Sequence, residues 1–189
     1  MQHHHQNGGD SAEVLARLEQ AVAAETRAIE ENSSSVQAHF RRGVLYGQLV
    51  QPQQAIEDFT QVIGLEPGNA EAYYNRGMAY VHVQQLALAI EDFTKAIECN
   101  PAHVHAYNNR AAAYFEALYP ERAIEDAERA LALDPKFASG YAVRAMARAR
   151  LGMDEPARDD VAKAVELGFD GRVLGALVSQ ARMGRNSRR

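Results

Sequence analysis

The chain has 189 residues, of which 47% are apolar and 24% are charged, and its formal net charge is −5 at pH 7. Acidic chains are poorly suited to general nucleic-acid binding, and no apolar run approaches the roughly 20 residues that a membrane helix requires. We therefore expect neither nucleic acid nor a membrane as a partner. The single cysteine, Cys99, offers no sign of an oxidising compartment, and we expect a cytoplasmic protein.

The chain begins with a polar segment. Residues 1–10 lack the apolar core of a secretory signal, and we expect them to be disordered or, with His3 to His5, a tag remnant. Residues 11–35 predict an N-terminal half-repeat with a helix over Ser11 to Asn32. The reason is that the sequence TRAIE at 26–30 returns as TKAIE at 94–98, two periods of 34 residues later.

Four segments follow one another without gaps at that period: 36–69, 70–103, 104–137 and 138–169, the last degenerate at its end. A residue's place in its segment is called its column below. Column twenty is alanine in every segment, and column eight is glycine or alanine, so small residues recur where helices approach closely. Proline stands at column thirty-two of the first three segments, where it ends a helix. Each segment therefore predicts two helices and a turn.

These columns resemble the tetratricopeptide repeat family, which has an aromatic residue at column four, Tyr at eleven and Pro at thirty-two. His39 departs from the pattern at column four, Arg148 at column eleven and Phe169 at column thirty-two. The resemblance covers Val36 to about Leu167. It implies an all-α fold, a right-handed solenoid of helix-turn-helix repeats with capping helices at both ends.

A break at Gly168 to Gly171 precedes the last predicted helix. Apolar residues within 173–181 trace one helical stripe, so we expect residues 170–184 to form a capping helix over the fourth repeat. The basic tail, 185–189, could contact an acidic partner or RNA, and we favour the alternative of a solvated end.

Every repeat keeps an arginine at column seven and an aspartate at column twenty-three. We expect these residues to form structural ion pairs between helices, because guanidinium and carboxylate groups pair bidentately. Residues that bind a specific ligand would vary between repeats, and these do not. The eight residues are Arg42, Arg76, Arg110, Arg144, Asp58, Asp92, Asp126 and Asp160.

The family resemblance places the first helix of each repeat along a concave groove that binds a peptide. Amides there could bond a peptide backbone, aromatic rings offer stacking area, and arginines could pair with carboxylates. The alternative is that these side chains are simply exposed or contact a neighbouring repeat. The candidate groove residues are Arg41, Tyr74, Asn75, Met78, His82, His105, Asn108, Asn109, Phe115 and Arg150.

One specialised groove of the family is a clamp for the acidic tails of heat-shock chaperones, which requires paired cations. In its columns the chain offers Phe40, Val44, Asn75, His105 and Asn109, so only the asparagines remain. We therefore expect no adaptor of that type.

Catalytic interpretations rest on three histidines, His82, His103 and His105, which could in principle bind zinc. No carboxylate or thiol pattern completes a site around them, and we expect Cys99 to be a core thiol. The chain also lacks a glycine-rich phosphate loop. We therefore expect neither an enzyme nor a metal or cofactor.

The sequence predicts a non-enzymatic scaffold, most simply a monomer, that binds a peptide or a protein segment in its groove. The alternative is a self-assembling structural module, in which the helix over Val173 to Ala181 is displaced and two arrays stack end to end.

Overall fold

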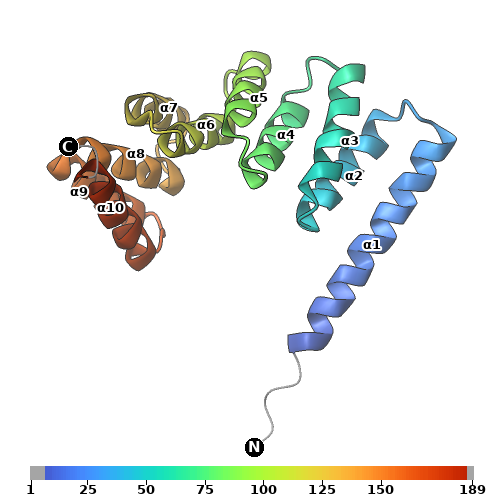
Figure 1. Cartoon of the computed structure of the whole chain (residues 1–189), viewed down its shortest axis with the longest axis horizontal. Coiled ribbons are helices and arrows are strands. Elements are labelled where there is room, and N and C mark those ends of the chain that lie inside the picture. The colour runs from blue at the N-terminus through green and yellow to red at the C-terminus, as the bar shows by residue number, and fades with distance from the viewer. Residues whose placement is uncertain (1–6, 187–189) are drawn as a thin grey trace, which may run out of the picture. The chain divides into compact units, whose positions relative to one another are not determined.

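The computed structural model describes residues 7–186, which form ten helices and no strand (Figure 1). The chain divides into two compact units: unit 1 is Met1–Gln85 and unit 2 is Leu86–Arg189. Unit 1 contains α1 Asn7–Glu31, α2 Val36–Gln48, α3 Pro52–Leu65 and α4 Ala70–His82. Unit 2 contains α5 Leu86–Cys99, α6 Val104–Glu116, α7 Pro120–Leu133, α8 Ala138–Leu151, α9 Asp154–Glu166 and α10 Gly171–Asn186. Among residues 7–186, no helix has the length and apolar character needed to span a bilayer.

Helix boundaries differ from the expected ones mainly at the two ends. Helix α1 begins at Asn7, so 7–10 are helical where a disordered segment was expected. Helix α10 likewise continues to Asn186, into the segment expected to be a tail. Residues 1–6 and 187–189, which hold the rest of both segments, lie outside the described residues.

The turn between the two helices of a repeat has the same backbone form in each repeat. Column fifteen adopts a left-handed conformation, with φ of 55° at Val50, 60° at Gln84, 69° at Leu118 and 81° at Gly152. Only the fourth repeat has glycine there, and this conformation is least favourable for a β-branched residue such as Val50. Within a unit, a turn of this form sets how the second helix of a repeat returns along the first.

Small residues let the helices of a unit pack closely. A Cβ atom added at Gly43 would lie 3.0 Å from the Phe59 ring, so α2 approaches α3 at a distance that only glycine tolerates without rearrangement. Phe59, Val62 and Ala72 are almost completely buried with it in the core of unit 1. The recurring small columns are therefore packing positions.

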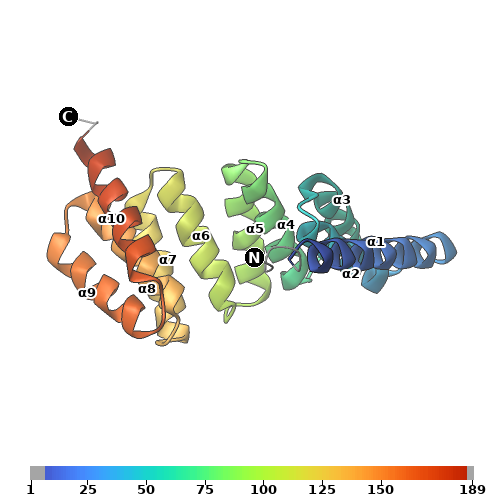
Figure 2. The same ribbon diagram turned by 90° about the horizontal axis from the view of Figure 1, so that it is seen from below.

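Helix α10 covers the end of unit 2. It lies against α8 and, over a shorter length, against α9 (Figure 2). Its buried Leu174, Val178 and Ala181 pack with the alanines of α8 in one cluster. Burying a leucine side chain stabilises a fold by about 1.5–3 kcal/mol, so this stripe holds the helix in place.

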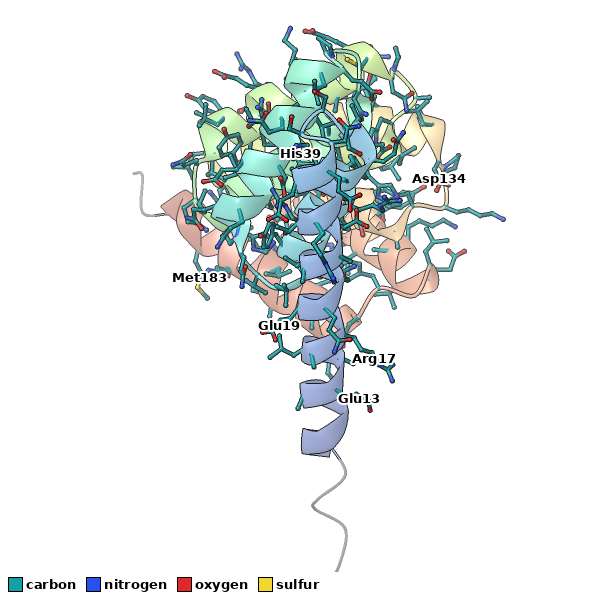
Figure 3. The ribbon with its side chains drawn as sticks, turned by 90° about the vertical axis from the view of Figure 1, so that its right-hand side faces the viewer. Glu13, Arg17, Glu19, His39, Asp134 and Met183 are labelled. Carbon is teal, nitrogen blue, oxygen red and sulfur yellow. The ribbon has the colours of Figure 1, made fainter. Side chains whose placement is uncertain are left out.

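Helix α1 contacts α2 in the same way as the second helix of one repeat contacts the first helix of the next repeat in unit 2. Arg42 Nη1 donates to Thr26 Oγ1 at 3.1 Å, as Arg110 Nη1 donates to Thr94 Oγ1 at 2.9 Å in unit 2. Glu13, Arg17 and Glu19 lie on the part of α1 that extends past the other helices of unit 1 (Figure 3). The half-repeat interpretation of this segment therefore rests on a contact that recurs elsewhere in the chain.

Three of the column-seven arginines, Arg42, Arg110 and Arg144, each bind the column-twenty-three aspartate of their own repeat through two hydrogen bonds. Arg42 Nε and Nη2 each donate to Asp58 at 2.8 Å, and Arg110 donates to Asp126 at 2.7 and 2.8 Å. Arg144 donates to Asp160 at 3.0 and 2.7 Å. Arg76 and Asp92 belong to different units.

Each pair joins the two helices of one repeat, and its carboxylate is buried. The hydrogen bond from Arg42 to Asp58 raises the pKa of Arg42. Burial alone would lower the pKa of Arg110, but the hydrogen bond and charge of Asp126 outweigh it, and the pKa is raised. Because the guanidinium pKa is raised in the folded state, the guanidinium stays charged throughout the range below the usual arginine pKa, and its contribution to stability is lost on the alkaline side only as the pH rises above that range.

The first and fourth repeats modify this pairing where the sequence departs from the family. His39 Nδ1 lies 2.9 Å from Asp58 Oδ1, and its Nε2 lies 3.1 Å from the Ser33 carbonyl, so this ring ties the loop before α2 to α3. In the fourth repeat Arg148 Nη1 donates to Asp160 Oδ2 at 2.8 Å. Both departures add a partner to the buried aspartate.

Cys99 was expected in the core, and that expectation is wrong: its side chain is exposed. Column thirty is the last residue of the second helix, where the chain leaves the packed layer. Leu65 and Leu133 occupy the same column and are 43% and 44% exposed.

Candidate binding groove

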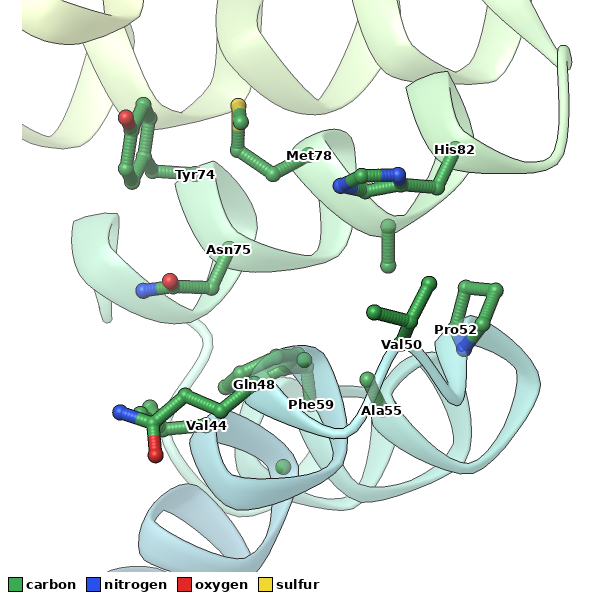
Figure 4. A pocket seen from close by; sticks show the side chains of 13 residues that line it. Val44, Gln48, Val50, Pro52, Ala55, Phe59, Tyr74, Asn75, Met78 and His82 are labelled. Carbon is green, nitrogen blue, oxygen red and sulfur yellow. The ribbon is translucent and has the colours of Figure 1, made fainter. Parts of the chain in front are cut away.

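Unit 1 contains a pocket with a cavity volume of about 310 Å³ between α2, α3 and α4 (Figure 4). We name it the Gly47 pocket. Figure 4 shows Tyr74, Asn75, Met78 and His82 on α4, across from side chains of α2 and α3. The lining residues are Gly43, Val44, Gly47, Gln48, Val50, Pro52, Ala55, Phe59, Tyr74, Asn75, Met78, Ala79 and His82.

The space in this pocket exists because column twelve of the first repeat is a glycine. A Cβ atom added at Gly47 would meet no other atom within 4 Å, in contrast to Gly43 one turn earlier. A larger side chain at column twelve would therefore project into the cavity without a backbone clash. The absence of a side chain at Gly47 leaves the pocket open, whereas the absence of a side chain at Gly43 lets α2 pack closely against α3.

The pocket has apolar walls and uncharged polar groups. Val44, Phe59 and Met78 supply apolar surface, and none of the lining residues is Asp, Glu, Lys or Arg. Asn75 Nδ2 donates to the Glu71 carbonyl at 2.7 Å, which holds the amide in one orientation. Such a lining favours an apolar side chain whose backbone bonds the amides nearby.

Val50 adds an apolar surface that its backbone conformation turns outward. It is 71% exposed although it lines the pocket, and it holds the left-handed φ of 55°. The same conformation recurs at column fifteen of every repeat, so the turn imposes it. The exposed Val50 side chain leaves apolar area beside the pocket uncovered.

A second pocket of about 290 Å³ lies toward the N-terminal ends of α2 and α4. We name it the Glu66 pocket. Phe40 lines it and packs edge-on against Phe59, which lines the Gly47 pocket, with ring centroids 5.6 Å apart. The two pockets are therefore neighbours in one groove. The lining residues of the second are Val36, Gln37, Phe40, Arg41, Glu66, Asn69 and Glu71.

The structure brings half of the predicted groove residues together in unit 1. Tyr74, Asn75, Met78 and His82 line the Gly47 pocket, and Arg41 lines the Glu66 pocket. Arg41 Nε also forms an ion pair with Glu25 Oε1 at 2.9 Å, so α1 partly neutralises it.

The two groove candidates nearest the end of unit 2 are engaged with each other. The Arg150 guanidinium lies 4.6 Å from the centre of the Phe115 ring, and its Nε donates to the Ala181 carbonyl of α10 at 3.0 Å. A cation that stacks on a ring and bonds a helix carbonyl differs from the ligand-facing arginine that the sequence suggests. Helix α10 thus supplies the hydrogen-bond acceptor for Arg150.

The remaining candidates also differ from the expected picture. Asn108 is only 7% exposed, and its Nδ2 donates to Asn109 Oδ1 at 3.2 Å, so it is a buried amide and not a ligand-facing one. His105 packs edge-on against Phe137 at 5.2 Å. The nearby His103 starts α6, where its Nδ1 accepts a hydrogen bond from Ala106 N.

Sequence reasoning missed the part of the pocket that the second helix and its turn supply. Val50, Pro52, Ala55 and Phe59 line it although only first helices were considered. The signal was present at Gly47, because a glycine among the groove columns removes the side chain that would cover α3.

Models of the tetratricopeptide repeat match residues 36–69, 70–103 and 104–137, which together make up more than half of the chain. The chain belongs to the tetratricopeptide repeat family. A search of curated protein sequences finds no match.

Solved structures share the fold of this tetratricopeptide repeat protein. MamA is 24% identical with a TM-score of 0.77, and the match covers 87% of this chain and 96% of MamA. YrrB, described as a repeat protein with an unusual peptide-binding site, is 21% identical with a TM-score of 0.72 over 92% of this chain and 88% of YrrB. The first repeat domain of Spaghetti (RPAP3), bound to the HSP90 peptide SRMEEVD, is 26% identical with a TM-score of 0.61, over 64% of this chain and 96% of that one. The likeness to MamA and YrrB shows the fold alone.

Proposed function

We propose that the protein is a non-enzymatic scaffold whose groove in unit 1 binds an extended peptide or a segment of a partner protein. The observation that carries the proposal is the Gly47 pocket, an open apolar cavity flanked by the amides of Gln48 and Asn75. An apolar side chain of the ligand enters the cavity, and the amides bond its backbone.

Two related structures support this class of function. YrrB is described as having a peptide-binding site, and the Spaghetti domain binds a peptide of HSP90. That peptide is acidic, whereas the Gly47 pocket has no cationic lining residue. The support extends to peptide binding and not to an acidic ligand.

The mechanism is recognition by a surface that is already formed. Packed helices hold the pocket walls in place, so binding costs little ordering of the protein. Met78 can adapt its flexible thioether to side chains of different shape. A single anchor with a few amide contacts gives modest affinity, as expected for a scaffold that exchanges partners.

Gly47→Phe tests the proposal because it fills the cavity from an open backbone position. Gly64→Phe is the matched control: Gly64 lies on α3, lines neither pocket, and likewise has no atom within 4 Å of an added Cβ. Fluorescence anisotropy with a pool of labelled peptides that each carry one leucine should show binding to the wild type and to Gly64→Phe. Binding should fall at least about tenfold in Gly47→Phe, a change of about 1.4 kcal/mol. Equal binding by both variants would reject the groove as the site.

Self-assembly remains the second candidate, and exposed apolar residues on α1 favour it. Val14 and Leu15 are 54% and 48% exposed, whereas Leu174 of α10 is fully buried in unit 2. Assembly through α1 therefore requires no rearrangement, in contrast to displacement of α10. Sedimentation velocity over a range of concentrations distinguishes the two candidates. A rise in mass that Leu15→Ser abolishes would favour assembly, and a constant monomer mass would exclude it.

A further inference from the structure

The unit that contains the groove has a more negative net charge than the other unit. Unit 1 contains ten acidic and five basic residues, whereas unit 2 contains fifteen of each, so the net charge of −5 belongs entirely to the unit that holds the Gly47 and Glu66 pockets. A ligand of unit 1 therefore approaches a negative field, which favours cations.

Within the groove, the acidic groups gather at one end. Glu66 and Glu71 line the Glu66 pocket and are both exposed. The one cation there, Arg41, is paired with Glu25 at 2.9 Å. Two carboxylates and one guanidinium thus line the Glu66 pocket, and that guanidinium already has Glu25 as its partner, while the Gly47 pocket has no Asp, Glu, Lys or Arg in its lining.

The partial positive charges of the helix N-termini do not outweigh the negative charge at the Glu66 pocket. The N-termini of α2 and α4 lie near the Glu66 pocket and carry a partial positive charge. The side chains of Ser35 and Asn69 already accept hydrogen bonds from Ala38 N and Ala72 N there. The capped ends therefore offer an anion less than bare ends would, and the full charges of the carboxylates dominate.

We propose that the groove of unit 1 selects a peptide with two features: an apolar residue for the Gly47 pocket and a lysine or arginine for the Glu66 pocket. This inference rests on the proposed function of the same groove. The pockets are offset by about seven residues along α2, from Arg41 to Gln48, or about 10 Å at 1.5 Å per residue. An extended chain covers that distance in about three residues, so the cation follows or precedes the anchor by about three positions.

A symmetric peptide tests the charge preference without assuming a chain direction. Acetyl-Arg-Ser-Gly-Leu-Gly-Ser-Arg-amide places a cation three residues to either side of a leucine anchor, and two further peptides replace both arginines with serine or glutamate. Exposed ion pairs change binding by about 1.4-fold to 5-fold each, so the arginine peptide should bind the full chain about threefold to tenfold more tightly than the serine peptide. The glutamate peptide should bind the most weakly. The preference should fade as salt is raised from about 0.05 to about 0.5 M.

The double variant Glu66→Gln, Glu71→Gln should bring the arginine peptide to the affinity of the serine peptide. Glu57→Gln, which removes one carboxylate charge on α3 outside both pockets, should leave the preference intact. Equal binding of all three peptides, abolished by Gly47→Phe, would overturn the charge inference and leave the groove as the site. Peptide binding that Gly47→Phe does not alter would overturn the proposed function, and with it this inference.

Discussion

Column twelve holds Gly47 in the first repeat and Phe115 in the third, and the two units differ there in what lies beside the first helices. In unit 1 the glycine leaves the Gly47 pocket open, with His82 at its edge. In unit 2 the Phe115 ring occupies the equivalent position, and Arg150, in the column of His82, stacks on it at 4.6 Å. The same repeat pattern thus gives an open groove in unit 1, whereas in unit 2 the side chains at the equivalent positions contact each other.

The frame beneath both grooves is the same. The Arg42 to Asp58 and Arg110 to Asp126 hydrogen bonds measure 2.7–2.8 Å in the two units. Columns that pack the helices are therefore kept, while the groove columns vary. The comparison teaches that binding character in this chain is set by a few side chains on a constant support.

The largest expected effect comes from weakening the packing of α10, the helix that covers the end of unit 2. Leu174→Ala should lower the free energy of unfolding by about 2–5 kcal/mol, because it leaves a cavity at a fully buried position. Leu177, which is 37% exposed on the same helix, provides the control and should cost less than about 1 kcal/mol as alanine. Urea unfolding of the full chain measures both. Equal losses would mean that α10 is not held by its apolar stripe.

Phe115→Ala should convert unit 2 toward the form of unit 1. Removing a partly buried ring that also stacks on Arg150 should cost about 2 kcal/mol of stability. The same change should open a second apolar cavity. Titration calorimetry with the leucine-anchored peptide should then give two sites per chain in place of one, and unchanged stoichiometry would show that Phe115 is not what fills this position.

Alanine substitutions at Asn75 in unit 1 and Asn109 in unit 2 are expected to differ in their effect on peptide binding. Asn75→Ala should weaken peptide binding by about 0.5–1.5 kcal/mol, the usual net contribution of one hydrogen bond. Asn109→Ala, the same column one repeat later, lies in unit 2 and should leave binding unchanged. Anisotropy titrations of both variants compare them directly. A larger loss from Asn109→Ala would move the site into unit 2.

The smallest single effect is expected at Val50, in the turn at column fifteen. Val50→Gly should raise stability by about 0.5–1 kcal/mol, because it relieves a β-branched residue at φ 55° at some cost in chain entropy. Gly152→Val makes the opposite exchange in unit 2 and should lower stability by about 1–2 kcal/mol. Thermal unfolding monitored by circular dichroism tests the pair. Changes of the same sign would contradict the conformational explanation.

Periodicity predicted the fold well because packing columns repeat. Each 34-residue segment was expected to hold two helices and a turn, and residues 104–137 hold α6 and α7 joined by such a turn. The exposure of the Cys99 side chain could not be predicted in this way. Column thirty lies at the end of a helix, and the exposure of a residue there depends on where that helix ends.

The candidate site was harder to predict, because a groove depends on what covers each residue. Column assignments placed Tyr74 and His82 at the pocket, but the same columns in unit 2 gave the buried Asn108 and the stacked Arg150. Residues from outside the repeat frame, such as Ala181 of α10, decide these outcomes. A 34-residue pattern carries no information about contacts that occur once.

The most direct test of the open groove in unit 1 is an amide chemical-shift map of the isotope-labelled chain during titration with the arginine peptide. We predict that the largest shifts occur at Gly47, Asn75, Met78 and His82, and that Gly47→Phe removes them. Shifts concentrated on Phe115 and Arg150 with unit 1 unchanged would contradict the central claim, because they would place the binding surface in the unit that engages itself.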